Sequence, residues 1–169
     1  TARRTSLDYA RRVMTNLHND LTRTYGTDWH LRELFDKNYA ETRMPEVPSM
    51  ILELLAHQNF TDMKFAHDPN FKFTASRAVY KAILQYLSAM HGEPQPAVQP
   101  LPVHAFAARL VKGQDAVQLS WQPTPDSIEA SAVPTDYIVY TRTPNTDFDN
   151  GRLTNGRTTV NFPVIPGTH

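Results

Sequence analysis

The spacing of apolar residues along the chain changes near Gly92. Before that point, two segments carry apolar residues at every third or fourth position, which predicts amphipathic helices over residues 5–25 and 74–90. The apolar stripe of the second helix is expected to face the core, with Lys81 on the outer side. After Gly92, apolar and polar residues alternate, and this period of two predicts β-strands.

Two strands are predicted between these helices. The alternation within residues 38–44 is that of a partly exposed strand. Residues 49–55 follow Pro48 and are apolar except for a serine and Glu53, which is typical of a strand buried on both faces of a parallel sheet. The order helix, strand, strand, helix predicts an α/β fold over residues 1–92. We expect this segment to be the C-terminal part of a larger α/β/α domain.

Glu53 is the candidate catalytic residue. An unpaired carboxylate in a buried strand is costly, so its presence there needs an explanation. Glu53 lies near the end of the predicted strand, and active sites of open α/β sheets lie outside the carboxyl ends of the strands. The alternative is a structural carboxylate that pairs with an arginine or accepts backbone hydrogen bonds. Arg43 is one possible partner, although it is more simply expected to pair with Glu41.

A polar turn, His57-Gln58-Asn59, follows the predicted strand. His57 lies four residues after Glu53, so the two side chains could bind one metal if the backbone were helical there. Because the strand is expected to end between them, we place His57 at the rim of the site instead. Asn59 is expected to hydrogen-bond the backbone of the turn, as Asn does readily.

Residues 93–102 form a predicted linker to a second domain. The linker contains Pro94, Pro96, Pro100 and Pro102, so it is expected to be extended and semi-rigid. Beyond it, short strands separated by turns rich in Pro, Asn and Gly predict an all-β sandwich over residues 103–169. The predicted strands cover residues 105–111, 116–121, 136–142 and 158–164.

One acidic stretch of this second half, Asp147-Phe148-Asp149-Asn150-Gly151, could suggest a calcium site. It lacks the spacing of an EF-hand loop, in which ligands recur at fixed positions along twelve residues. A polar turn is therefore the favoured interpretation.

Composition excludes several functional classes. Lys and Arg number 17 and Asp and Glu number 17, so the chain lacks the basic surplus of a nucleic-acid-binding domain. It has no Cys, which excludes a disulfide framework and a cysteine metal site. No apolar run reaches the ~18 residues of a membrane span. The chain begins with Thr1 and shows no signal peptide, so we expect a processed or excised piece of a longer protein.

The segment around Glu53 resembles a block of the zinc-dependent N-acetylmuramoyl-L-alanine amidases. In that family the block runs Val-Pro-x, three hydrophobic residues, Glu, a hydrophobic residue, Gly-Phe, a hydrophobic residue, and Ser-Asn. Val47-Pro48, Glu53 and Asn59 match this pattern. Leu55-Ala56 replaces the Gly-Phe pair and His57-Gln58 replaces the hydrophobic-Ser pair, so the floor of the cleft is expected to be reshaped.

Residues 38–63 are similar to a divergent branch of this family, whose members are large secreted proteins often labelled xanthan lyase or golvesin-like. The resemblance covers residues 5–91. It implies a zinc-activated water that attacks the amide between the lactyl group of muramic acid and L-alanine. Glu53 would be the general base for that water and then the proton donor to the leaving amine. The zinc ligands of the family are two His and one Glu; they have no matching motif here and are expected upstream of Thr1.

The second half resembles a fibronectin type III domain. Leu119-Ser120-Trp121 matches the second strand of such domains, in which the Trp fills the core, and Tyr137-Ile138-Val139-Tyr140 matches the third. Pro166-Gly167-Thr168 resembles the turn before the tyrosine-corner strand. The resemblance implies a sandwich over residues 100–169 that is incomplete, because the chain stops at His169 before that strand.

Together the resemblances imply a secreted or periplasmic cell-wall hydrolase that acts on peptidoglycan or another polysaccharide or glycopeptide. They imply no nucleic-acid partner, and this chain alone is expected to be inactive. Two alternatives stay open. The xanthan lyase label would imply β-elimination on a polysaccharide, which needs a base such as Tyr or His and a group that neutralises the uronate. The other alternative is a non-catalytic envelope or carbohydrate-binding module.

Overall fold

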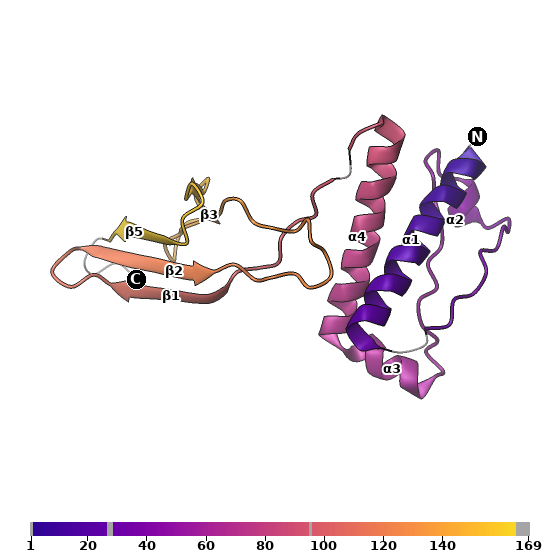
Figure 1. Ribbon diagram of the computed structural model, residues 1–169, viewed down its shortest axis with the longest axis horizontal. Coiled ribbons are helices and arrows are strands. Elements are labelled where there is room, and N and C mark those ends of the chain that lie inside the picture. Colours follow the sequence, from indigo (N-terminus) through magenta and orange to yellow (C-terminus); the bar gives the residue numbers. More distant parts are fainter. Residues whose placement is uncertain (1, 27–28, 95, 165–169) are drawn as a thin grey trace. The chain divides into compact units, whose positions relative to one another are not determined.

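The computed structural model describes residues 2–26, 29–94 and 96–164 of the chain. It divides into two compact units, Thr1–Pro96 and Ala97–His169. The first unit is helical and the second holds two small antiparallel sheets (Figure 1). The architecture is therefore mixed α and β, and the described residues form no closed barrel or sandwich.

Two long antiparallel helices build the first unit. α1 spans Ala2–Tyr25 and α4 spans Pro69–His91, so both predicted helices are confirmed and both begin earlier than predicted. Apolar side chains fill most of the interface between them, and those of α4 are largely alanine, which allows the two backbones to approach closely. The buried core residues are Val13, Leu17, Leu21, Phe71, Ala75, Ala78 and Ala82.

Local signals set the ends of α4. The Asp68 carboxylate accepts a hydrogen bond from the backbone N–H of Asn70 at 2.9 Å, and Pro69 occupies the first helical turn, where its missing N–H costs nothing. Gly92 ends the helix with a φ of 66°, in the left-handed region that glycine adopts without strain.

The strands predicted between the helices do not form. Residues 38–44 contain the short helix α2, Ala40–Arg43, and residues 49–55 have no regular secondary structure. Ile51 and Leu52 are exposed rather than buried. A strand requires a neighbour that pairs with its N–H and C=O groups, and the described part of this unit contains no other strand. The α/β sheet expected within residues 1–92 is therefore wrong for this structure.

An aromatic cluster closes the end of the helix pair at α3, Phe60–His67. The rings of Tyr25, Trp29, Phe65 and Phe71 have centroids between 5.0 and 6.3 Å apart. Trp29 thereby fixes the start of the long connector that runs from α1 to α3. Figure 1 shows this connector beside α1, on the side away from α4.

The second unit contains a three-stranded and a two-stranded antiparallel sheet. The first sheet has the order β1-β2-β5, and the second pairs β3 with β4. Three predicted strands are confirmed, the one at residues 136–142 shrinks to two residues, and β4 was not predicted. The strands are β1 His104–Leu110, β2 Ala116–Gln122, β3 Ile138–Val139, β4 Arg152–Leu153 and β5 Thr159–Pro163.

Trp121 is the buried centre of this unit. Its ring contacts that of Tyr137 edge-on at 5.5 Å, so it joins β2 to the segment before β3. On the same face of the sheet, Leu110 lies opposite Val117 yet is exposed. The face is therefore only partly covered by the described residues. Residues 166–168, which resemble the turn before a tyrosine-corner strand, lie outside the described part of the chain.

The boundary between the two units falls within the predicted linker of residues 93–102. Val98 is buried, and its N–H donates to the Ser131 hydroxyl at 3.3 Å. Residues 97–102 of the predicted linker therefore belong to the second unit.

Candidate functional site

Glu53 lies on the extended segment 49–55, whose start is tied to the helical unit. The Ser49 N–H donates to the Ser6 hydroxyl of α1 at 3.2 Å, and the Ser49 hydroxyl donates to the Thr42 carbonyl at 3.0 Å. These two bonds attach the start of the segment to α1 and to α2.

The end of the segment is held by a capped turn. The Ala56 N–H donates to the Asp62 carboxylate at 2.9 Å. Asn59 caps α3, because its side-chain oxygen accepts from the N–H groups of Thr61 and Asp62. Asn59 thus hydrogen-bonds backbone N–H groups as predicted, although these groups belong to α3 and not to the turn itself.

Apolar side chains of the segment complete its attachment. Met50 and Leu55 pack against the core of the helix pair, whereas Ile51, Leu52 and Leu54 are exposed. The backbone on both sides of Glu53 is therefore fixed, while the intervening residues face solvent.

The Glu53 carboxylate is exposed, with 78% of its side chain accessible, so its predicted burial is wrong. Its charged neighbour is Arg32, whose guanidinium nitrogen lies 3.8 Å from the carboxylate and whose side chain is 70% accessible. Arg43 instead donates to the Asn38 side chain at 3.1 Å, so the structure supports neither a pair with Glu41 nor one with Glu53. Glu53 is thus not the buried structural carboxylate that the alternative interpretation required.

His57 lies exposed in the turn after Ala56, in keeping with a place at the rim. Across the described residues, no three side chains of His, Cys, Asp or Glu come together in a group that could hold a metal ion. Glu53 and His57 therefore do not form the core of a metal site here, and these residues do not fit a zinc ion.

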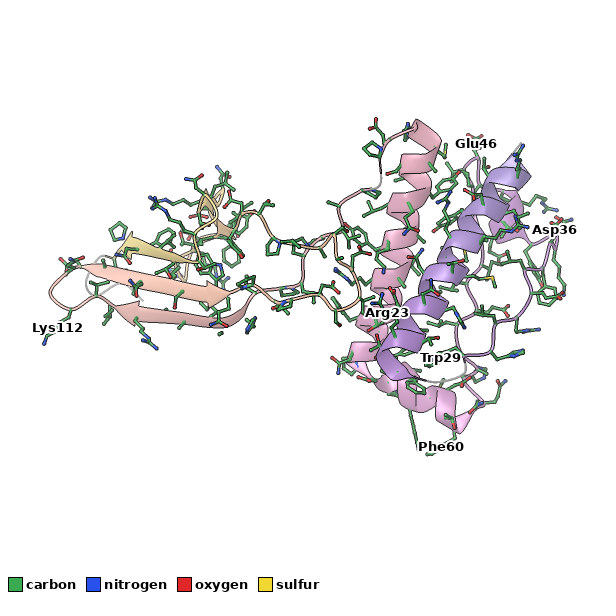
Figure 2. The ribbon with its side chains drawn as sticks, in the orientation of Figure 1. Arg23, Trp29, Asp36, Glu46, Phe60 and Lys112 are labelled. Carbon is green, nitrogen blue, oxygen red and sulfur yellow. The ribbon has the colours of Figure 1, made fainter. Side chains whose placement is uncertain are left out.

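A cluster missed by sequence reasoning adjoins Glu53. The Arg32 guanidinium lies 5.3 Å from the centre of the Phe35 ring, and the Lys37 ammonium also lies 5.3 Å from it. Phe35 is 62% exposed. The signal was the short pattern Arg-x-x-Phe-x-Lys at residues 32–37, in the part of the connector that precedes α2 and has no regular secondary structure. Figure 2 shows Trp29 beside the end of α1 and Asp36 farther out on this same connector.

A second missed feature is the buried ion pair between α1 and α4. Lys81 Nζ lies 2.9 Å from the Asp20 carboxylate, and each side chain is only 5% accessible, so the expected outer position of Lys81 is wrong. Beside this pair, Asn16 donates to the Gln85 side chain at 2.8 Å. The matching four-residue spacings, 16 to 20 and 81 to 85, were the signal that could have revealed this polar layer.

Comparisons with protein families, curated proteins and solved structures found no match for this chain. Any function must therefore be argued from the chemistry of its own residues.

The acidic stretch of the second unit is a polar turn. Asp149 accepts hydrogen bonds from the Thr141 hydroxyl, the Thr141 N–H and the Gly151 N–H. These donors hold the pKa of the Asp149 carboxyl below its usual value. Because the Asp149 carboxylate accepts hydrogen bonds within this segment, a structural role in the turn accounts for it.

Proposed function

We propose that this chain is part of a cell-wall hydrolase that cleaves amide bonds of peptidoglycan, with Glu53 as the acid–base residue. The observation that carries the proposal is the combination of a fixed backbone and an exposed carboxylate. Ser49 and Ala56 anchor the segment on either side of Glu53, while the carboxylate itself remains open to a substrate. A general base must reach the proton that it removes, and Glu53 meets that condition better than a buried carboxylate would.

The chemistry assigned to Glu53 is proton transfer. Its carboxylate accepts a proton from the attacking water as the C–O bond forms at the amide carbon. It then donates that proton to the leaving nitrogen as the C–N bond breaks, which returns the carboxylate to its starting state. One carboxylate can serve both steps because an amide hydrolysis consumes one water and needs no net proton.

Zinc is the metal that the sequence resemblance implies. The described residues do not provide a set of ligands for it, so no step of the mechanism is derived through a metal. What this chain contributes to the proposal is the acid–base residue and its surroundings.

The location proposed is the cell envelope or the exterior, as expected of an enzyme that meets peptidoglycan. None of the described helices combines the length and apolar character needed to cross a membrane. The second unit is proposed to be a fibronectin type III-like spacer, supported by its β1-β2-β5 sheet, its separate β3-β4 pair and the buried Trp121.

The test is hydrolysis of purified peptidoglycan by the natural full-length protein, assayed with added zinc and again with a chelator. Release of stem peptide from muramic acid is expected, and Glu53→Gln is expected to lower kcat at least a hundredfold, the lower range for loss of a general acid–base group. Glu46→Gln, at an exposed carboxylate of the same connector, serves as the matched control. Turnover by Glu53→Gln equal to that of the control would refute the role of Glu53.

A second candidate is a non-catalytic envelope module. It would be favoured if the parent protein proved to lack a full set of zinc ligands. In the same assay, this candidate predicts that the protein sediments with peptidoglycan without releasing peptide.

A lyase acting on an acidic polysaccharide would instead generate an unsaturated sugar, detectable by its ultraviolet absorbance.

A further inference from the structure

The side of α4 that faces away from α1 carries a row of residues that we name the α4 seam. Its members are Phe73, Ser76, Tyr80, Ile83, Leu87 and Met90. We infer that two copies of this chain associate along this seam, with their α4 helices side by side and running in opposite directions. The interface is independent of the proposed function, because the seam contains no residue of the segment around Glu53.

The first observation is that α4 is apolar on two opposite sides. One side packs against α1 and α3 within the helical unit and carries the buried residues of the helix pair. On the other side, the seam residues Phe73, Ile83, Leu87 and Met90 are between 38% and 55% exposed. The connector lies beside α1, away from α4, and does not cover them (Figure 1). A helix that is apolar all round is normally buried on every side, so the seam requires a partner.

The second observation is the spacing of the seam residues. They follow one another at intervals of 3, 4, 3, 4 and 3 positions, which is the heptad repeat of helices that pack side by side. The seam runs for about 25 Å along the helix. Its intervals are the same when read in either direction. Two antiparallel copies can therefore align all their seam positions about a single two-fold axis.

The aligned residues are complementary in size. The pairs across the axis are Phe73 with Met90, Ser76 with Leu87 and Tyr80 with Ile83, each formed twice. The small Ser76 leaves room for Leu87, and the flexible thioether of Met90 can contact the Phe73 ring. In a parallel pair each residue would instead face its own copy. Two serines would then leave a gap between two layers of large side chains, so the antiparallel arrangement fits better.

The charges at the two ends of the seam favour the same arrangement. Lys72 is exposed in the first turn of α4, where the dipole of its own helix disfavours a cation. In the antiparallel pair it lies near the end of α4 of the second copy, where the exposed Glu93 follows Gly92. The last carbonyl groups of that helix also carry partial negative charge. A parallel pair would bring the two Lys72 side chains together.

The experiment is sedimentation equilibrium of the 169-residue chain over about a hundredfold range of concentration. We expect a reversible equilibrium between monomer and dimer. Leu87→Glu places a carboxylate in the seam twice per dimer and is expected to raise the dissociation constant at least about tenfold. Leu and Glu have similar helix propensities, so the circular dichroism of this variant should match that of the unaltered chain.

The matched control is Leu31→Glu. Leu31 is 44% exposed and Leu87 is 45% exposed, but Leu31 lies on the connector rather than on α4. The same substitution therefore adds the same charge at an equally exposed leucine outside the seam. This variant is expected to associate as the unaltered chain does.

An exchange of charges tests the orientation of the helices. Lys72→Glu and Glu93→Lys each create two like-charged contacts in a dimer of that variant, so each is expected to raise the dissociation constant about fivefold. An equimolar mixture of the two variants should associate about as tightly as the unaltered chain. In the mixed dimer, an acidic and a basic side chain again meet at both ends of the seam.

Three results would overturn the inference. The first is a chain that stays monomeric at every concentration, which would leave the second unit or a different protein to cover the seam. The second is a dimer that Leu87→Glu and Leu31→Glu weaken equally, because its interface would then lie elsewhere. The third is a mixture of the two charge variants that associates no more tightly than either variant alone, which would exclude the antiparallel arrangement.

Discussion

Two of the ion pairs in the helical unit differ in almost every physical respect. Asp20 and Lys81 meet at 2.9 Å between α1 and α4, with each side chain 5% accessible. Arg32 and Glu53 are 3.8 Å apart on the surface, and both are largely accessible. Water is excluded from the first pair, so neither partner can leave without exposing an uncompensated charge to the core. The second pair can separate at little cost, because both partners are solvated when apart.

The largest effect is expected from breaking the buried pair. Asp20→Ala leaves Lys81 charged between the two helices, and the free energy of unfolding should fall by about 3–5 kcal/mol. Urea unfolding followed by circular dichroism at 222 nm reports this, because most helical signal comes from α1 and α4.

A double substitution sharpens that prediction. Asp20→Leu combined with Lys81→Met removes both charges and keeps apolar volume, so it should recover most of the lost stability. If Asp20→Ala costs less than about 1 kcal/mol, the pair is solvated in solution and the contrast with Arg32–Glu53 fails.

A smaller effect should follow from crowding the same interface. Ala78 is fully buried where α4 faces α1, so Ala78→Leu should cost about 1–3 kcal/mol by forcing the helices apart. Ala89→Leu is the control, since Ala89 is exposed on the same helix and both changes lower the intrinsic helix propensity by the same small amount. Equal stabilities of the two variants would show that the helix pair is less tightly closed than the buried ion pair requires.

Sequence reasoning found the two long helices because each repeats its apolar residues over several turns. The same reasoning failed at residues 49–55. A run of apolar residues that short fits a buried strand or an irregular segment, and only a neighbouring strand could decide between them. The described part of the first unit contains no strand to pair with it. Glu53 was therefore identified as a candidate, while its surroundings were predicted wrongly.

Lys81 shows the opposite kind of error. A single lysine within a helix is normally assigned to the solvent face, and only its partner on another helix reveals that it is buried. That partner, Asp20, is separated from it by 61 positions in the chain. Local periodicity carries no information about such a pair. Sequence reasoning missed the cluster at Arg32 and Phe35 for a related reason. The connector has no regular spacing of apolar residues from which a buried and an exposed face could be assigned.

Between these two extremes lie exposed carboxylates that accept several hydrogen bonds from nearby backbone N–H groups and threonine hydroxyls. Asp136 accepts from the N–H groups of Gly156 and Tyr137 and from the Thr154 hydroxyl, and these bonds lower its pKa. Asp149 is held similarly near Gly151. A lowered folded-state pKa means that the stabilisation is complete above the ordinary value of 3.8 and is lost as the pH falls through the folded value.

We therefore expect the β3–β4 region to loosen below about pH 4. Amide hydrogen exchange at Gly151 and Gly156 measures this, with the α1–α4 amides as the internal reference. Asp136→Asn should abolish the response at Gly156 and leave that at Gly151, because the two carboxylates serve different turns. Loss of both responses in this variant would mean that the turns act as one unit.

The smallest effect on stability is expected from removing Arg32. Arg32→Gln breaks the surface pair with Glu53 and the contact with Phe35, yet the free energy of unfolding should change by no more than about 0.5 kcal/mol. Lys64→Gln, which loses only a cation–π contact, should behave in the same way in the urea measurement. A loss above about 2 kcal/mol for Arg32→Gln would mean that Arg32 holds the connector in place. In that case the difference in stability between the buried and the exposed ion pair would largely disappear.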